Sequence, residues 1–447
     1  MLIEAADAFE KGDVKHAREL YQRRLERDPN DVEALSELAD LTYAYNPLVG
    51  KSSQEAVPVL NRLLAIDSDN GLALWNLAML AGQRDDLAAF DSLMTRMLDH
   101  PRAAEDRSNF ARQFRVLAVH GLDSLDAALG RMRNVERHVH IANYLAGYTH
   151  RYDVARAIGE RLSNGDYTEE TRRNGRWILS VLESLEGRPQ ASDALADDDP
   201  GPDFGRLLVD RVMRDAVPQF AAPRERLEKL KAMAEAWDTT TQHLDPHSVI
   251  EGHYGEIRAY LLGILAVRLG DDAGHARQIS YLRSRSGATS PGEPPYVFAR
   301  TLEGLKDWRD GRLDAALVSF DNAQMYVNDV CASCSNAHSQ TLNRFVRAEI
   351  LFEQGRHGDA LGWYGSLFDG DQWWGAVHVG ISTVRSAEIA EATGNTTEAV
   401  RLYGKFLDLW KNAEPELQPL VQDARRRMDQ LVTAGTREPQ RTVTPGG

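Results

Sequence analysis

Apolar and small residues recur along this chain at the spacing of short helices that pair across tight turns. Four times a glycine is followed five residues later by an alanine and nine residues later by an aromatic residue. The four sets are Gly12/Ala17/Tyr21, Gly311/Ala316/Phe320, Gly355/Ala360/Tyr364 and Gly394/Ala399/Tyr403. A small residue also lies seven positions before each glycine, namely Ala5, Gly304, Ala348 and Ala387. This pattern predicts helical hairpins that stack and share one continuous core.

The helical period predicts hairpins along most of the chain. In the first hundred residues the predicted helices are 2–11, 14–27, 32–45, 54–66, 72–81 and 86–98. The middle is more divergent, with helices predicted at 107–119, 124–132, 139–149, 153–162, 169–185, 204–213, 224–237, 249–269 and 273–285. The helix at 169–185 is predicted to be single. Three further hairpins span 296–409, and an apolar stripe in 414–432 predicts a helix that caps the stack.

These elements predict an all-α fold, a curved solenoid of helix hairpins, in four segments. They are N-terminal repeats at 1–105, divergent hairpins at 106–290, C-terminal repeats with the capping helix at 291–432, and a flexible tail at 433–447. Acidic residues and prolines favour a loop at 196–203. The polar, proline-containing end favours a frayed tail.

The turn glycine, the alanine and the aromatic residue resemble the tetratricopeptide repeat (TPR), in which these positions carry the packing of the two helices. The resemblance implies a TPR-like α–α superhelix that binds another protein. The first helix departs from that family, because the positions eleven and eight before the glycine are polar. They are Arg300/Glu303, Arg344/Arg347 and Thr383/Ser386. Apolar residues lie instead at ten, seven and three before the glycine, so the sequence leaves the binding face open.

The stretch from 260 to 431 also resembles the C-terminal TPR region of large bacterial signalling proteins, which follows a serine/threonine kinase, a cyclase or a transcriptional activator. The segments that carry the likeness are 259–271, 347–355 and 403–421. The motifs of a kinase are absent from the sequence. This resemblance implies either a separate adaptor or a regulatory or sensor module of a bacterial signalling system.

Charge and hydropathy restrict the partners and the location. A formal net charge of −15 counts against nucleic acid, whose phosphates are neutralised by Lys and Arg. The longest apolar run, 259–267, is too short for a membrane span, which needs about 20 residues. No secretion signal opens the sequence, and two cysteines do not make a disulfide framework. We therefore predict a cytoplasmic protein without a nucleic-acid or membrane partner.

Cys331, Cys334 and His338 form the sharpest chemical feature of the sequence. Two thiolates and an imidazole could supply three zinc ligands, or the thiols could be redox-active. A closed zinc site needs a fourth ligand, and small residues that pack a tight turn explain the motif equally well. With no catalytic motif in the sequence, we expect no cofactor and no enzymatic activity, and keep a metal or small-molecule site at this motif as an alternative.

Aromatic and basic residues in the last hairpins offer candidate contacts for a protein or peptide partner. Trp373 and Trp374 are adjacent, so both cannot face inward from one helical turn, and one is expected at a binding surface. Arg344 and Arg347 are three residues apart, share a helix face, and could hold an acidic side chain or a chain end. The sequence predicts a non-catalytic scaffold with these four residues as peptide contacts.

Overall fold

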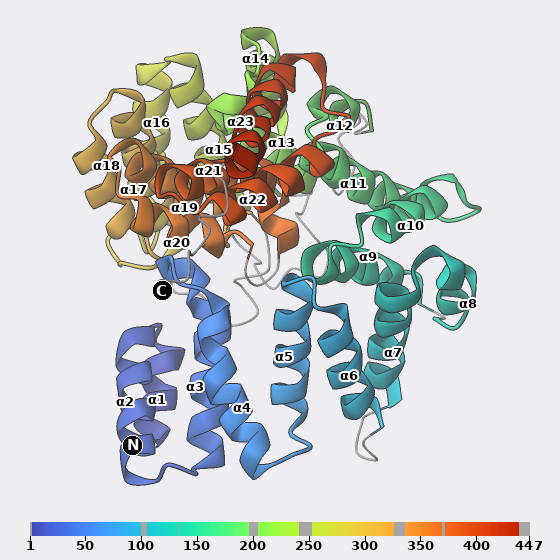
Figure 1. Cartoon of the computed structure of the whole chain (residues 1–447). Coiled ribbons are helices and arrows are strands. Elements are labelled where there is room, and N and C mark those ends of the chain that lie inside the picture. The colour runs from blue at the N-terminus through green and yellow to red at the C-terminus, as the bar shows by residue number, and fades with distance from the viewer. Residues whose placement is uncertain are drawn as a thin grey trace, which may run out of the picture.

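The computed structural model describes residues 2–99, 105–132, 134–195, 204–240, 253–325, 336–368 and 372–437. All the regular elements in these ranges are helices, and no strand is present among them. The helices follow one another as antiparallel pairs (Figure 1). This confirms the predicted all-α fold.

The N-terminal hairpins lie close to their predicted bounds. Their helices are α1 (Leu2–Glu10), α2 (Val14–Arg27), α3 (Val32–Tyr45), η1 (Pro47–Val49), η2 (Ser53–Ala56), α4 (Val57–Ile66), α5 (Gly71–Gln83), α6 (Leu87–Leu98), α7 (Glu105–His120), η3 (Gly121–Ser124) and α8 (Leu125–Gly130). The insertion that the sequence places between the two helices of the second hairpin forms the short helices η1 and η2.

The middle of the chain continues the same alternation. Its helices are α9 (Glu136–Thr149), α10 (Tyr152–Asn164), α11 (Glu169–Leu185), α12 (Pro189–Leu195), α13 (Phe204–Ala216), η4 (Pro218–Phe220), α14 (Arg224–Ala236), α15 (Tyr254–Leu269) and α16 (Asp272–Arg283). Helix α11 has its predicted bounds, but the expectation that it is single is wrong, because the short helix α12 packs back against it. The loop predicted at 196–203 lies outside the described residues.

The C-terminal hairpins are α17 (Pro294–Arg309) with α18 (Leu313–Asp321), α19 (Thr341–Glu353) with α20 (His357–Ser366), and α21 (Gln372–Ala392) with α22 (Thr396–Leu409). The short helix η5 (Pro415–Leu417) and α23 (Gln418–Arg437) follow. Helix α23 extends five residues further than the predicted capping helix, into the segment predicted as a tail. Residues 438–447 lie outside the described residues.

The hairpin turns depend on the recurring glycines. Gly12, Gly311, Gly355 and Gly394 all have φ between 71° and 77°, a left-handed conformation that glycine adopts without steric cost. The small residue before the turn faces the aromatic residue after it. A Cβ atom on Gly304 would lie 2.6 Å from the ring of Phe320. The predicted turn and its packing are therefore confirmed at residue level.

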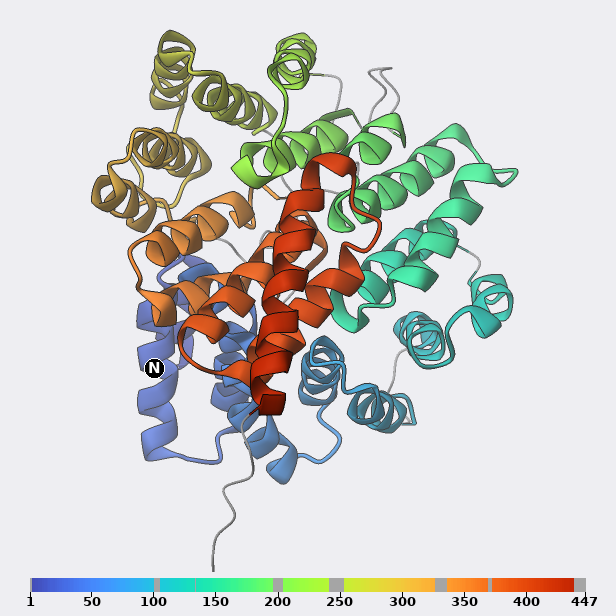
Figure 2. The same ribbon diagram turned by 45° about the horizontal axis from the view of Figure 1, so that its top comes forward.

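The superhelix closes on itself. Helix α21 packs against α9, α11 and α13, and its side chains Trp373, Ala376 and Val379 complete a core that is otherwise built from residues 78–185. Figure 2 shows the C-terminal helices, in red, lying across the centre of the ring formed by the earlier helices. Helix α21 of the last hairpin thus covers a face of the middle hairpins.

Candidate functional site

Trp373 and Trp374 both lie against Trp177 of α11. The ring centroids of Trp373 and Trp177 are 5.2 Å apart, and those of Trp374 and Trp177 are 6.1 Å apart. Trp373 is only 3% exposed, whereas Trp374 is half-buried. The expectation that both cannot face inward is therefore corrected, and a surface contact at Trp374 stays a prediction. Both rings reach the interior because α11 lies alongside the start of α21.

Polar groups surround the same indole. The Arg206 guanidinium lies 3.8 Å from the centroid of the Trp177 ring, and Trp177 Nε1 donates a hydrogen bond of 2.8 Å to Asp210. Asn336 Nδ2 donates a second bond, of 2.5 Å, to Asp210. Burial raises the pKa of Asp210 to about 6, against these two bonds and the charge of Arg206, which lower it. The cluster joins α11, α13 and the segment before α19.

Arg347 is buried and committed to partners within the chain. Its Nε and Nη1 atoms donate bonds of 2.7 Å to Asn343 and Asp321, and a further bond goes to the carbonyl of Phe320. The guanidinium also lies 4.5 Å from the centroid of the Trp363 ring. Burial lowers its pKa to about 10, so the group stays charged at neutral pH.

Arg344 is buried as well, at 6% exposure. Its Nη1 atom donates a bond of 2.8 Å to the carbonyl of Ser366. Hairpin packing thus covers Arg344 and Arg347, the two residues expected to hold an acidic side chain or a chain end of a partner. The same holds for Thr383 and Ser386 at the equivalent positions of the next hairpin. The role of Arg344, Arg347, Trp373 and Trp374 as partner contacts stays a prediction.

The cysteine motif is divided by the limits of the described residues. Cys331 and Cys334 lie outside them, and His338 lies inside, 1% exposed. Burial lowers the pKa of His338 to about 3, so its imidazole is neutral at physiological pH. Among the residues that the structure describes, no group of three or more His, Cys, Asp or Glu side chains could hold a metal ion. The zinc alternative stays a prediction.

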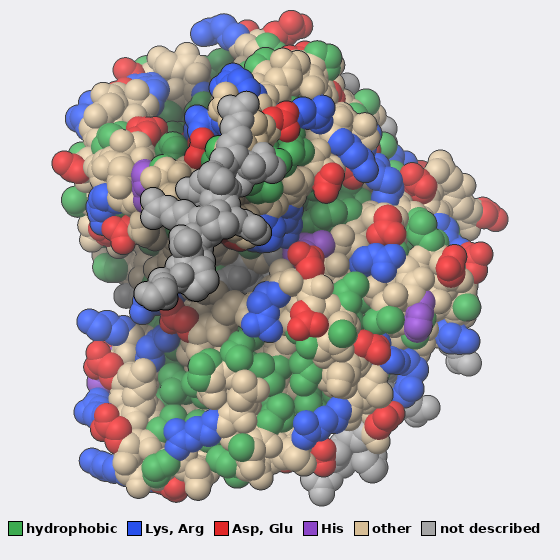
Figure 3. All heavy atoms as spheres, in the orientation of Figure 1, with side chains coloured by type: hydrophobic (Ala, Val, Ile, Leu, Met, Phe, Trp, Pro, Cys, Tyr) green, Lys and Arg blue, Asp and Glu red, His purple; other side chains and the backbone are tan. Residues whose placement is uncertain are grey.

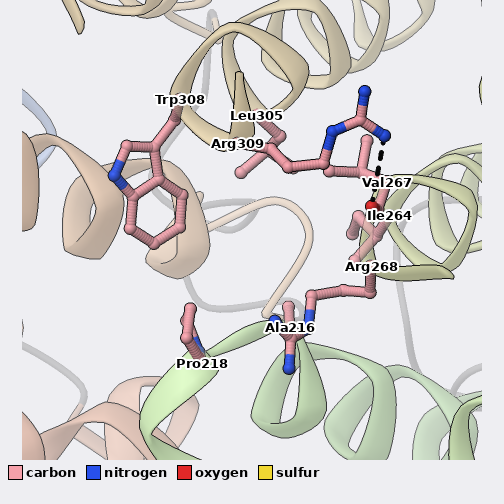
Figure 4. A pocket seen from close by; sticks show the side chains of 8 residues that line it. All are labelled: Ala216, Pro218, Ile264, Val267, Arg268, Leu305, Trp308 and Arg309. Carbon is pink, nitrogen blue, oxygen red and sulfur yellow. Dashed lines mark hydrogen bonds between the residues drawn. The ribbon is translucent and has the colours of Figure 1, made fainter. Parts of the chain in front are cut away.

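A pocket of about 160 Å³ lies where three helices end, and we call it the Trp308 pocket. It is lined by the ends of α13, α15 and α17 together with η4 (Figure 4). The residues that line it are Ala216, Pro218, Ile264, Val267, Arg268, Leu305, Trp308 and Arg309. Figure 4 shows the Trp308 indole on one side, with Arg268 and Arg309 across from it. The walls are apolar, and exposed Pro218 and half-buried Trp308 leave one side open to solvent.

The two arginines of the pocket differ in their partners. Arg309 is exposed and forms ion pairs of 2.8 Å with Asp272 and 2.7 Å with Asp310. Half-buried Arg268 donates Nε to the carbonyl of Asp215, at 3.0 Å, and forms no ion pair with any described residue. The Asp215 carboxylate is held by Arg214 and Arg226, each at 2.8 Å. Arg268 therefore brings a positive charge to the pocket that no carboxylate of the described chain contacts.

Neither Trp308 nor Arg268 is among the partner contacts predicted from the sequence. A usable signal was present, because Arg268 follows directly after the nine-residue apolar run 259–267. A charged residue that ends a buried helix must lie at the margin of the core. The sequence does not reveal that α13 and α17 end beside it, which makes the pocket.

The surface seen in Figure 3 mixes acidic and basic side chains, and hydrophobic side chains gather over its lower part, which the N-terminal hairpins form. Exposed hydrophobic residues of these hairpins include Val49, Ile66 and Leu72. Within the described ranges, no helix combines the length and the apolar character that crossing a membrane requires.

Comparison with known proteins gives fold-level likeness alone. No protein-family model and no curated protein matches the chain. The TPR domain of P58(IPK) is 13% identical over 98% of this chain and 98% of that chain, with a TM-score of 0.24. The structure of Naa15/Naa10 bound to HypK-THB is 13% identical over 96% of this chain and 80% of that chain, with a TM-score of 0.24. At these values we draw nothing about function from either structure, and the TPR-like fold rests on the hairpins themselves.

Proposed function

We propose that this chain is a non-catalytic scaffold that binds a segment of another protein. The observation that carries the proposal is the Trp308 pocket, which is open and apolar and is lined by Arg268, a charge that forms no ion pair with a residue of the described ranges. Its volume of about 160 Å³ is well below the roughly 300 Å³ or more of typical small-molecule sites. A pocket of this size suits one side chain of a larger partner.

Stacked hairpins support the same function, because a solenoid offers a long surface from few residues. Arg344, Arg347 and Trp373 are buried, so the proposal places the first contact at the Trp308 pocket. Half-buried Trp374 stays a second proposed contact. We extend the proposal to a cytoplasmic adaptor or regulatory module of a bacterial signalling system, with no nucleic-acid partner because of the net charge of −15.

The test is an affinity capture from native lysate with the tagged full chain. The matched control is the double variant Arg268→Gln/Trp308→Ala. We expect a protein that the intact chain retains at least roughly tenfold better than the variant, because one desolvated charge contact and one aromatic anchor are lost. Capture of no protein, with a small molecule found in the purified chain by native mass spectrometry, would overturn the scaffold proposal.

A further inference from the structure

We infer that the Trp308 pocket binds an aliphatic side chain and a neighbouring carboxylate of a partner peptide. This inference rests on the proposed function and adds the chemistry of the partner. The two parts of the ligand follow from the two parts of the pocket, since its walls are apolar and its remaining charge is Arg268.

The size of the pocket sets the apolar part of the ligand. A cavity of about 150 Å³ lined by apolar side chains holds a group the size of benzene. The Trp308 pocket, at about 160 Å³, accordingly has room for one leucine side chain. Ile264, Val267 and Leu305 form the walls against which such a side chain would pack.

The charge of the pocket sets the polar part of the ligand. Arg268 uses Nε for the carbonyl of Asp215, and its Nη atoms have no hydrogen-bond partner among the described residues. A guanidinium prefers to bind carboxylates through two N–H donors. The carboxylates nearest to the pocket are already engaged, since Asp215 binds Arg214 and Arg226 and Asp272 binds Arg309. The carboxylate of Glu353 faces Trp308 and accepts a hydrogen bond from the Trp308 side chain.

An acidic ligand can therefore form an ion pair with Arg268, which no carboxylate of the described residues forms. Arg309 lies at the same pocket but is exposed and paired with two carboxylates, so a ligand gains little from it. This difference provides a matched pair of variants at one site. Arg268→Gln removes a charge that forms no ion pair with any carboxylate of the described residues, and Arg309→Gln removes one that is paired with Asp272 and Asp310.

The experiment is ¹⁹F NMR on the full chain labelled with 5-fluorotryptophan. The Trp308 signal is assigned from its absence in Trp308→Phe. Three capped peptides are titrated: acetyl-Ala-Asp-Leu-Ala-amide, the same peptide with Asn for Asp, and the same peptide with Ala for Leu. We expect the first to shift the Trp308 signal, and the other two to bind at least roughly fivefold more weakly. Arg268→Gln should weaken the first peptide to the level of the Asn peptide, and Arg309→Gln should retain most of its affinity.

The outcomes distinguish a carboxylate of a peptide from that of a small organic acid. Free 4-methylpentanoate that binds as tightly as the Asp-Leu peptide would overturn the assignment to a peptide and favour a small organic acid. Equal binding of the Asp and Asn peptides would overturn the role of Arg268. If the lysate capture yields a partner that the pocket variant retains fully, the scaffold function stands and the pocket assignment fails.

Discussion

Burial shifts the pKa of single residues of this protein, and the neighbouring residues in the sequence do not reveal this shift. His378 of α21 is fully buried, stacks on Phe345 with ring centroids 5.0 Å apart, and neither ring nitrogen has a hydrogen-bond partner among the described residues. Burial, helped by the charge of Arg344, lowers its pKa from 6.5 to about 3. The unfolded chain therefore takes up a proton below pH 6.5 that the folded chain rejects. The stability linked to His378 is present above pH 6.5 and is lost as the pH falls toward 3.

We predict that His378→Phe flattens this acid dependence. The variant should be as stable as the parent at pH 7 or more stable by about 1 kcal/mol, because an unsatisfied buried group is removed. Between pH 6 and pH 4 it should lose less stability than the parent, by up to about 1.4 kcal/mol per pH unit. Urea unfolding at several pH values measures both effects.

The comparison of variant and parent cancels other groups that titrate in this range. Like His378, buried His338 has a lowered pKa and therefore makes the folded chain less stable as the pH falls. Asp210 has a raised pKa and therefore makes the folded chain more stable as the pH falls from 6 to 4. Replacing exposed His120 by Gln is the control for the loss of an imidazole at the surface. Parallel pH profiles for His378→Phe and the parent would contradict the prediction.

At the scale of the helix, stability depends on how closely the two members of a hairpin approach. Gly304 of α17 lies against Phe320 of α18, which is fully buried and has no room to move. We predict that Gly304→Ala destabilises the chain by about 1–3 kcal/mol through overpacking. Gly404 of α22 has no atom within 4 Å of its added Cβ, so Gly404→Ala should stabilise by about 0.5–1 kcal/mol.

Thermal unfolding of the two glycine variants measures this difference. The double variant Gly304→Ala/Phe320→Leu should recover part of the loss, because the smaller side chain makes room for the added methyl group. A Gly304→Ala chain as stable as the Gly404→Ala chain would show that the hairpin accommodates the extra carbon, contrary to the prediction.

The elements that the sequence predicted correctly have local causes. The turn glycines at 12, 311, 355 and 394 and the bounds of α11 follow from residues within one hairpin. Helix α12 was missed because Pro189–Leu195 spans only seven residues, too few for a helical period to be recognised. Its existence depends on packing against α11 and on contacts with residues more than 200 positions away.

The same limit explains the candidate site. Arg344 and Arg347 lie eleven and eight positions before a turn glycine, where the hairpins of this chain have polar residues. The repeat pattern does not reveal which other hairpin covers these positions. The Trp308 pocket likewise needs the ends of three helices from residues 216 to 309. Periodicity describes a face of a helix, whereas burial of that face is decided by the winding of the whole superhelix.

At the scale of the whole molecule, a small set of contacts near α12 adds to the packing of α21 in closing the superhelix. Trp410 Nε1 donates a bond of 3.0 Å to the carbonyl of Leu185, and Trp410 packs against Gly187, where a Cβ would lie 2.9 Å from the indole. The Glu414 carboxylate accepts bonds of 2.8 and 2.9 Å from the backbone N–H groups of Gln190 and Ala191 at the start of α12. We call these the closing contact.

We predict that Glu414→Gln loosens the closing contact while the hairpins stay folded. The carboxylate accepts from two N–H groups at a helix start, where a negative charge is favourable, and an amide replaces it with a neutral group that has one acceptor oxygen. A loss of about 1 kcal/mol should speed amide hydrogen exchange of Gln190 and Ala191 roughly fivefold. Helical circular dichroism should remain unchanged, because each hairpin keeps its own packing.

Glu416→Gln is the matched control for this variant. Glu416 is exposed and accepts one bond of 2.8 Å from the Gln190 side chain, so its replacement should leave exchange at α12 near the parent rate. Faster exchange spread evenly over all helices in Glu414→Gln would mean global destabilisation and contradict a local closing contact. Faster exchange confined to α12 and residues 410–417 would instead mean that the superhelix opens at this point before its hairpins unfold. In that case the faces of α9, α11 and α13 that α21 covers become accessible without loss of the repeat fold.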